Sequence, residues 1–280
     1  NGIRAVNPNA SSPHVYTIAA GILMTQDQTW GITNNTAAGL TDLIVSGPIS
    51  DGAASFGLVK TGSGTLTLAG NNSFDGIMLV TSGGVLRVTH DNALGSTNGY
   101  TVVTNGACLE IGGNVNVPEP LKLSGDASFG SNGTLRAIGG TNIWSGAITQ
   151  SVRSRIGAES GSSLTLTGGI TGPSITLSPK SNAVVAVSDQ PLKVGAGTVY
   201  AHGQGTIAFG SSGNTWNTLE IAGATVRMDA PNTLPSASIL SVGISSALDG
   251  TIDLNGNNQI VAQLKRGLTT TGKRLVTSEA

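Results

Sequence analysis

Carboxylate side chains are the groups in this sequence best suited to catalysis, and they are spread singly along the chain. Glycoside hydrolysis needs two carboxyl groups that converge on one bond, and lyase chemistry needs acidic ligands beside a basic residue. The 280 residues contain 15 Asp and Glu, with no Asp-Asp or Asp-x-Asp pair. The closest two are Asp249 and Asp253. Because Asp253 falls on an outward position of a strand pattern, we expect it to be solvated or stacked in a ladder rather than catalytic.

The histidine and arginine residues do not complete a catalytic signature either. Ala201-His202-Gly203 lacks the first Gly of the Gly-His-Gly found in polygalacturonases, and Arg155-Ile156-Gly157 has Gly where their Arg-Ile-Lys has Lys. His14, His90 and His202 lack the spacing of metal ligands. Calcium-binding nonapeptides, phosphate loops and nucleophile elbows in a strand-to-helix setting are also missing. We therefore predict no catalytic residue, no cofactor-binding residue, no metal ligand, no cofactor and no enzyme activity.

Composition excludes several other classes of function. Charged residues are 10% of the chain, against roughly 25% in an average globular protein, and the net charge is −1. This leaves no electrostatic footprint for nucleic acid; the basic cluster of Lys265, Arg266, Lys273 and Arg274 is interpreted as a solvated edge. No apolar run approaches the ~18 residues of a membrane span. The single cysteine, Cys108, excludes an internal disulfide and is predicted to be a packed thiol.

Strand patterns recur along the whole chain, whereas helix patterns are nearly absent. Gly or Pro interrupts almost every stretch in which apolar residues would line one face of a helix. Short alternations of polar and apolar residues, each closed by Gly, Asn or Ser, predict strands instead. The clearest examples are 65–68, 121–123, 163–166, 183–187 and 225–228.

These strands share a template that reads polar, apolar, polar, apolar, any residue, Gly. It closes at Gly70, Gly113, Gly125, Gly168, Gly223 and Gly256. The gaps lie within about one residue of multiples of eleven, and a strand with its turn takes roughly eight to twelve residues. Segments 64–72 and 250–258 agree at six of nine positions, and Trp30, Trp144 and Trp216 are interpreted as a further recurring side. Such self-similarity predicts stacked repeats with two or three sides and roughly 22 to 33 residues per coil.

Stacking explains why such short strands would be stable. A four-residue alternation buries only two side chains, but a coil above and below pairs every backbone group at a spacing of about 4.8 Å. Glycine at the corners would supply the positive φ of sharp turns. The Asn71-Asn72 and Asn257-Asn258 pairs are expected to form amide ladders along the axis.

One block of the sequence is specific enough to compare with a known family. The segment from Gly57 to Gly76, which contains Lys-Thr-Gly-Ser-Gly-Thr-Leu-Thr-Leu, closely resembles the autotransporter-associated β-strand repeat, also called the passenger-associated transport repeat. Residues 80–88 and 93–95 continue the resemblance, and 250–264 looks like a diverged copy. The resemblance implies a right-handed parallel β-helix in a secreted passenger of Gram-negative bacteria. It also implies roles in export and folding, and in adhesion, aggregation or surface coating.

The sequence thus predicts an all-β fold, a right-handed parallel β-helix (β-solenoid). We expect one solenoid segment over 1–280, with the repeat at 57–95 and the diverged copy at 250–264. The predicted function is a non-enzymatic, extracellular structural or adhesive segment of a bacterial cell-surface protein, able to assemble into a fibre or surface layer. A polysaccharide-active β-helix and an autochaperone module are the alternatives.

The expected location is extracellular, at the outer membrane of a Gram-negative-type bacterium. The expected partners are further copies, bound through solenoid ends or strand faces, and host, cell-surface or polysaccharide ligands. No nucleic acid is expected, and the parent protein would be anchored in the membrane through a region outside this chain.

Overall fold

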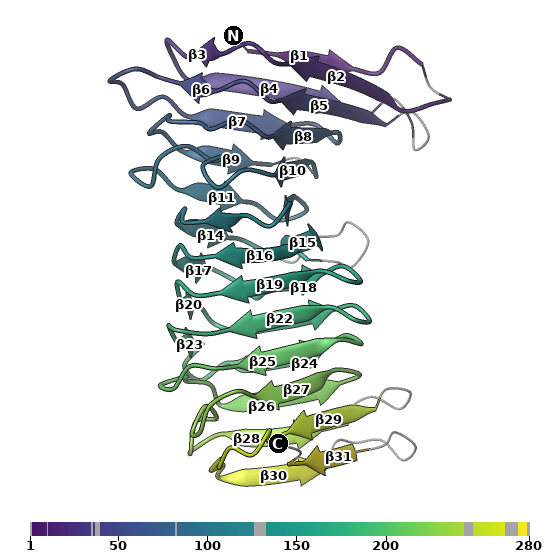
Figure 1. The fold of residues 1–280 in the computed structure, drawn as a ribbon, viewed down its shortest axis with the longest axis vertical. Coiled ribbons are helices and arrows are strands. Elements are labelled where there is room, and N and C mark those ends of the chain that lie inside the picture. Colours follow the sequence, from purple (N-terminus) through teal and green to yellow (C-terminus); the bar gives the residue numbers. More distant parts are fainter. Residues whose placement is uncertain are drawn as a thin grey trace.

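The computed structural model describes residues 2–9, 11–34, 36, 40–81, 83–125, 133–243, 249–266 and 274–278. In this part of the chain every regular element is a β-strand and no helix occurs. The strands wind into stacked coils with the N-terminus at one end and the C-terminus at the other (Figure 1). All paired strands run parallel to their neighbours, which confirms the predicted parallel β-solenoid. No helix that could cross a membrane is present among the described residues.

Three long sheets form the sides of the solenoid, and within each sheet the strands stack in the order in which the chain forms them. The first sheet contains β1 (Arg4–Val6), β4 (Gln28–Thr33), β7 (Leu58–Thr61), β9 (Met78–Val80), β11 (Thr101–Val103), β14 (Leu121–Leu123), β17 (Ile148–Gln150), β20 (Ile170–Thr171) and β23 (Leu192–Lys193). The second sheet contains β2 (His14–Ile18), β5 (Thr41–Val45), β8 (Thr65–Leu68), β10 (Val85–Val88), β12 (Cys108–Gly112), β15 (Leu135–Gly139), β18 (Ser154–Ala158), β21 (Ile175–Pro179), β24 (Thr198–His202), β26 (Thr218–Ala222), β28 (Ile239–Val242) and β30 (Gln263–Arg266).

The third sheet begins partway along the solenoid. It contains β13 (Asn116–Val117), β16 (Thr141–Trp144), β19 (Ser163–Leu166), β22 (Val184–Val187), β25 (Thr206–Phe209), β27 (Thr225–Met228), β29 (Gly250–Asp253) and β31 (Arg274–Thr277). A small fourth sheet pairs β3 (Ile22–Leu23) with β6 (Ile49–Ser50) near the N-terminus.

The register places like residues above one another. Leu66 pairs with Leu86, which pairs with Leu109, and all three side chains are fully buried. Along the second sheet, successive partners lie 20 to 27 residues apart in the sequence. This is the two-sided end of the predicted range. Each such leucine contributes about 1.5–3 kcal/mol by burial, so the continuous core stabilises strands that would not fold singly.

The shared strand template does not mark one side of the coil. Strand β8 lies in the second sheet, whereas β29, the closest match to it in sequence, lies in the third. The interpretation of the tryptophans was also wrong: Trp30 lies in the first sheet, on β4, and Trp144 lies in the third, on β16. Trp216 follows Thr215, which bridges to β23 of the first sheet. All three are buried, so the pattern reports core packing and not a repeated position.

Two template glycines serve close approach rather than an unusual backbone angle. Gly113, Gly125, Gly223 and Gly256 have positive φ, as predicted, but Gly70 and Gly168 do not. A methyl group on Gly168 would lie 2.1 Å from the carbonyl oxygen of Gly146, one coil away. Glycine is required there because the backbones of successive coils touch.

The predicted asparagine ladders form only in part. Asn92 Nδ2 donates to Asn71 Oδ1 over 2.9 Å, which is an amide contact along the axis. Asn72 is buried instead, where it accepts from the Ile49 N–H and donates to the Ala93 carbonyl. Asn257 likewise donates to backbone carbonyls, at Met228 and Asn255. These asparagines satisfy backbone groups of the turns, because a buried turn needs partners for its N–H and C=O groups.

Candidate functional site

The acidic pair singled out in the sequence has a structural setting. Asp253 lies on β29 and pairs in register with Arg227. Its Oδ1 accepts from the Asn255 N–H over 2.9 Å and from Thr277 Oγ1 over 3.4 Å. Asp249 is exposed in the preceding turn. Among the described residues, no group of three or more His, Cys, Asp or Glu side chains is placed to hold a metal ion.

The three histidines lie on different coils. His14 packs edge-on against Tyr16, with ring centroids 4.6 Å apart, and His90 Nδ1 accepts from the Asn92 N–H. His202 packs edge-on against Tyr200 on β24. Burial, followed by the positive charges of Arg155 and Arg153, lowers the pKa of His202 below its ordinary value. The structure thus does not bring the histidines together.

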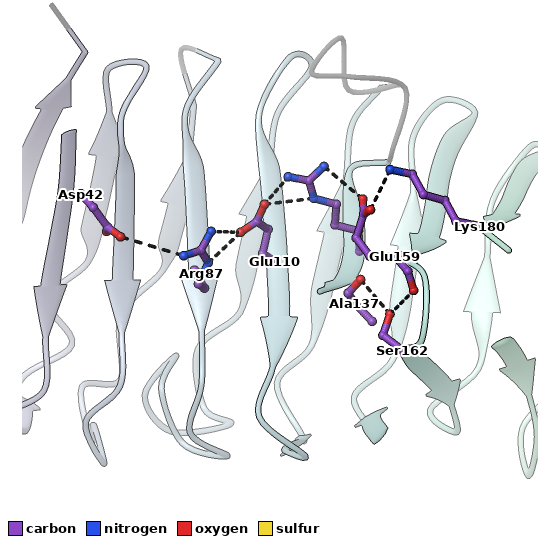
Figure 2. A network of polar contacts seen from close by, with 8 residues as sticks. Asp42, Arg87, Glu110, Ala137, Glu159, Ser162 and Lys180 are labelled. Carbon is purple, nitrogen blue, oxygen red and sulfur yellow. Dashed lines mark hydrogen bonds and ion pairs between the residues drawn. The ribbon is translucent and has the colours of Figure 1, made fainter. Parts of the chain in front are cut away.

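The most extended polar arrangement is a row of six charged side chains that runs along the solenoid axis. We call this row, formed by Asp42, Arg87, Glu110, Arg136, Glu159 and Lys180, the charge ladder. Its members alternate in sign and come from successive coils, apart from one coil between the first two in which Thr67 stands (Figure 2). Thr67 Oγ1 donates to Asp42 Oδ1 over 3.1 Å and so closes the gap. With Thr67, the ladder links an unbroken series of coils through side chains alone.

Glu110 is the centre of the charge ladder, because its two oxygens are divided between two arginines. Oε2 accepts from Arg87 over 2.8 Å, and Oε1 accepts from the Nε and Nη2 atoms of Arg136. The Glu110 side chain is only 3% exposed, whereas Arg87 is 35% and Arg136 17% exposed. A buried carboxylate is tolerated only when it is paired and hydrogen-bonded. Glu110 meets that condition through residues that belong to the coils on either side.

The ends of the charge ladder are more open to solvent. Glu159 accepts from Lys180 over 2.7 Å and lies 3.7 Å from Arg136. Ser162 Oγ donates to the backbone carbonyls of Glu159 and Ala137, which fixes the turn that carries Glu159 (Figure 2). At the other end, burial raises the pKa of Asp42, an effect opposed by the hydrogen bond from Thr67 and by Arg87. The outer pairs therefore contribute less than the Glu110 centre.

The charge ladder was missed in the sequence, where the acidic residues look scattered. A signal for it does exist: from Arg87 to Lys180, charges of opposite sign recur at intervals of 21 to 26 residues, which is one coil. The interval cannot be recognised until the coil length is known. Low overall charge suggests avoidance of stacked like charges, and the ladder reaches the same end by alternation.

Three other ionisable groups are buried inside the solenoid. Lys60, on β7, is fully buried and donates to the carbonyls of Thr61 and Gly62, and burial lowers its pKa to about 7. Glu119 is 2% exposed, and its carboxyl oxygens have no hydrogen-bond partner among the described residues; burial raises its pKa to about 8. Cys108 is buried and burial raises its pKa to about 12, which confirms the predicted packed thiol. Desolvation is the common cause, since it disfavours each charged form.

An open groove of about 510 Å³ crosses the outer face of the first sheet. Its floor is apolar, with Val59 on β7 and Leu79 on β9 paired in register. Its rim carries Asp27, Asp75 and Asn98, and it is closed at one side by Tyr100 and Ile77. These residues come from four successive coils, so the groove is elongated along the axis. Sequence reasoning did not identify it, because no two of its polar residues are neighbours in the chain.

Comparison with known proteins gives one positive result. Residues 58–88 match the family model described as the passenger-associated-transport-repeat. No curated protein and no solved structure matches the chain. The matched residues run from β7 to β10, which are two adjacent coils, and lie inside the range predicted from the sequence. The wider bounds of 57–95 and the diverged copy at 250–264 remain predictions. Taken with the parallel solenoid, the match fits the chain as an autotransporter passenger-like repeat protein.

Proposed function

We propose that this chain is a non-enzymatic, extracellular segment of a bacterial cell-surface protein, whose work is to form a rigid body that holds adhesive surfaces away from the cell. The observation that carries the proposal is continuous stacking: one sheet runs through twelve strands in a single parallel order within the described residues. Such a body resists bending because each coil is bonded to both neighbours. The repeat family suggests a secreted or cell-surface bacterial protein.

Two features of the surface support an adhesive or assembling role. Outward positions of the first sheet include Thr149, Thr171 and Lys193, which are exposed and arranged in one flat column. At the C-terminal end, Leu264 continues the core column of Leu240 but is 60% exposed. An uncovered coil presents both apolar side chains and unpaired backbone groups, so we infer that solenoid ends are a route to self-association. Host, cell-surface or polysaccharide ligands remain the other proposed partners.

The structure gives the alternatives less support. A polysaccharide-active enzyme would need carboxyl groups that converge on one bond. The acidic side chains best placed by the fold, those of the charge ladder, are instead paired with arginine or lysine. An autochaperone role rests on the matched repeat alone.

Attachment assays test the proposal in the bacterium that makes the parent protein. Loss of the whole protein should reduce cell–cell or surface attachment, and unchanged attachment would count against the adhesive role. In a second strain, deletion of residues 57–95 separates the autochaperone alternative, which predicts failed export of the remaining protein. Assay of the purified chain on uronate polymers and neutral polysaccharides addresses the enzymatic alternative, which requires product formation.

A further inference from the structure

We propose that the groove over β4, β7, β9 and β11 binds a neutral glycan chain that lies along the solenoid axis. This proposal rests on the adhesive function above and names a ligand class for one of its surfaces. The groove combines a flat apolar floor, an aromatic ring and fixed hydrogen-bonding groups on its rim. Sugars present the same combination, since they have apolar C–H faces and hydroxyl groups around their edges.

The apolar floor is local to the groove. Val59 and Leu79 are outward-facing neighbours on the sheet, and Ile77 beside them is 41% exposed. Further along the same outward column the residues become Lys122 and Thr149. Large apolar side chains on an outer sheet face lose solvation energy unless something covers them. The floor is therefore suited to the C–H face of a sugar ring, and Tyr100 adds an aromatic surface at its side.

The polar rim is held in place before any ligand arrives. Asp27 Oδ1 accepts from the Gly57 N–H over 2.8 Å. The Asp75 backbone N–H donates to the buried Asp51 carboxylate over 3.0 Å, and the Asp75 side chain accepts from Ser96 Oγ and Asn98 Nδ2. A carboxylate has about four acceptor positions, so each aspartate retains positions for hydroxyl donors. Fixed acceptors reduce the entropy lost when a ligand is ordered.

Charge distinguishes a neutral glycan from an acidic one. Asp27 and Asp75 make the rim acidic and would repel uronate or sulfated chains. The nearest cation is Lys122, whose Nζ lies 3.6 Å from the centre of the Tyr100 ring. This contact directs the ammonium group to the ring, so it does not neutralise the rim.

The geometry of the sheet favours a glycan over an extended peptide. A peptide binds a sheet most readily by pairing with an open edge. The floor strands β7 and β9 are each paired on both sides, so the groove offers no backbone ladder. Four coils at about 4.8 Å per coil give a groove roughly 14 Å long between its outer strands. That length suits a short run of sugar units arranged along the axis.

Direct binding measurements on the purified 280-residue chain test the proposal. Neutral oligosaccharides of glucan, mannan, galactan and chitin type are compared with oligogalacturonate and with a random peptide library. We expect at least one neutral series to bind, and Tyr100→Ala and Leu79→Arg each to weaken that binding tenfold or more. Tyr200→Ala is the matched control, because Tyr200 also faces outward beneath a cation, Arg153, but lies outside the groove. Circular dichroism confirms that each variant is folded.

The outcomes separate this proposal from the function on which it rests. Absence of neutral-glycan binding, preference for the uronate or peptide ligands, or binding that both groove variants leave unchanged would each overturn the glycan site. Cells that display Leu79→Arg and still attach normally would overturn its role in adhesion while the adhesive function stands. Glycan binding by the pure chain without any attachment phenotype would do the reverse.

Discussion

At the scale of single residues, two buried glutamates show how the solenoid treats charge. Glu110 is ionised between two arginines, whereas Glu119 has no hydrogen-bond partner among the described residues and is protonated near neutral pH because its pKa is about 8. Both residues are visible in the sequence, but their states are not. The state depends on which side chains the adjacent coils bring, 23 to 26 residues away for Glu110, and on whether the side chain points into the core.

The Glu110→Gln substitution should destabilise the chain by about 2 kcal/mol, because it leaves the guanidinium groups of Arg87 and Arg136 facing a neutral amide. Glu159→Gln is the matched control, with a change below about 1 kcal/mol since its pairs are more exposed. Urea denaturation followed by circular dichroism measures both free energies of unfolding. Equal losses for the two variants would show that Glu110 is not the centre of the charge ladder.

The Glu119→Gln substitution should change how stability depends on pH. Its folded-state pKa of about 8 lies above the ordinary 4.5, so the folded chain binds more protons than the unfolded chain between these values. Stability should therefore fall as pH rises from 4.5 to 8, and Gln, which does not ionise, should remove that part of the slope. Unfolding free energies at pH 5 and pH 8 provide the measurement. Identical pH slopes for wild type and variant would mean that Glu119 is solvated or paired in solution.

At the scale of elements, strands were predictable and their stacking partners were not. The alternations at 65–68, 121–123 and 163–166 became β8, β14 and β19, because two apolar residues facing a core define a short strand. These three strands nevertheless lie in three different sheets. The same four-residue pattern suits any side of the coil, while turns of variable length decide which side each strand occupies. The groove depends on that assignment, so it could not be predicted from local patterns.

Close contact between turns of adjacent coils predicts a sharp difference between two glycines. Gly168→Ala should destabilise the chain by about 1–3 kcal/mol, because the added methyl would meet the Gly146 carbonyl at 2.1 Å. Gly161→Asn should have little effect, because that site has open space and a φ of +76°, which Asn tolerates. Thermal unfolding midpoints of the two variants make the comparison. A tolerated Gly168→Ala would contradict the close stacking of these turns.

At the scale of the whole molecule, each coil is both a product of stacking and a template for the next. Core columns run through the coils until the C-terminal end, where Leu264 is 60% and Val276 is 54% exposed. Their in-register neighbours Leu240 and Ile252 are buried. The resemblance to passenger repeats allowed the solenoid to be predicted from about a fifth of the chain. The charge ladder and the exposed end face are properties of the assembled coils.

The exposed end face predicts concentration-dependent self-association of the purified chain. Leu264→Lys combined with Val276→Lys should reduce it, because lysine blocks both apolar contact and edge pairing. Val152→Lys is the control, since Val152 is 48% exposed but lies midway along the solenoid. Sedimentation velocity over a range of concentrations follows the association. If the end variant and the control associate equally, contact does not occur through this end.

Distances between spin labels test the parallel stacking most directly. Thr29, Lys122, Thr149, Thr171 and Lys193 are exposed members of one outward column of the first sheet, in which each coil adds one residue. With one label at Thr29→Cys, the buried Cys108 replaced by Ala, and the second label at each of the others in turn, the distances should be about 19, 24, 29 and 34 Å, an increase of about 4.8 Å per coil. Distances that do not rise steadily along this series, as two sheets packed face to face would give, would contradict the solenoid.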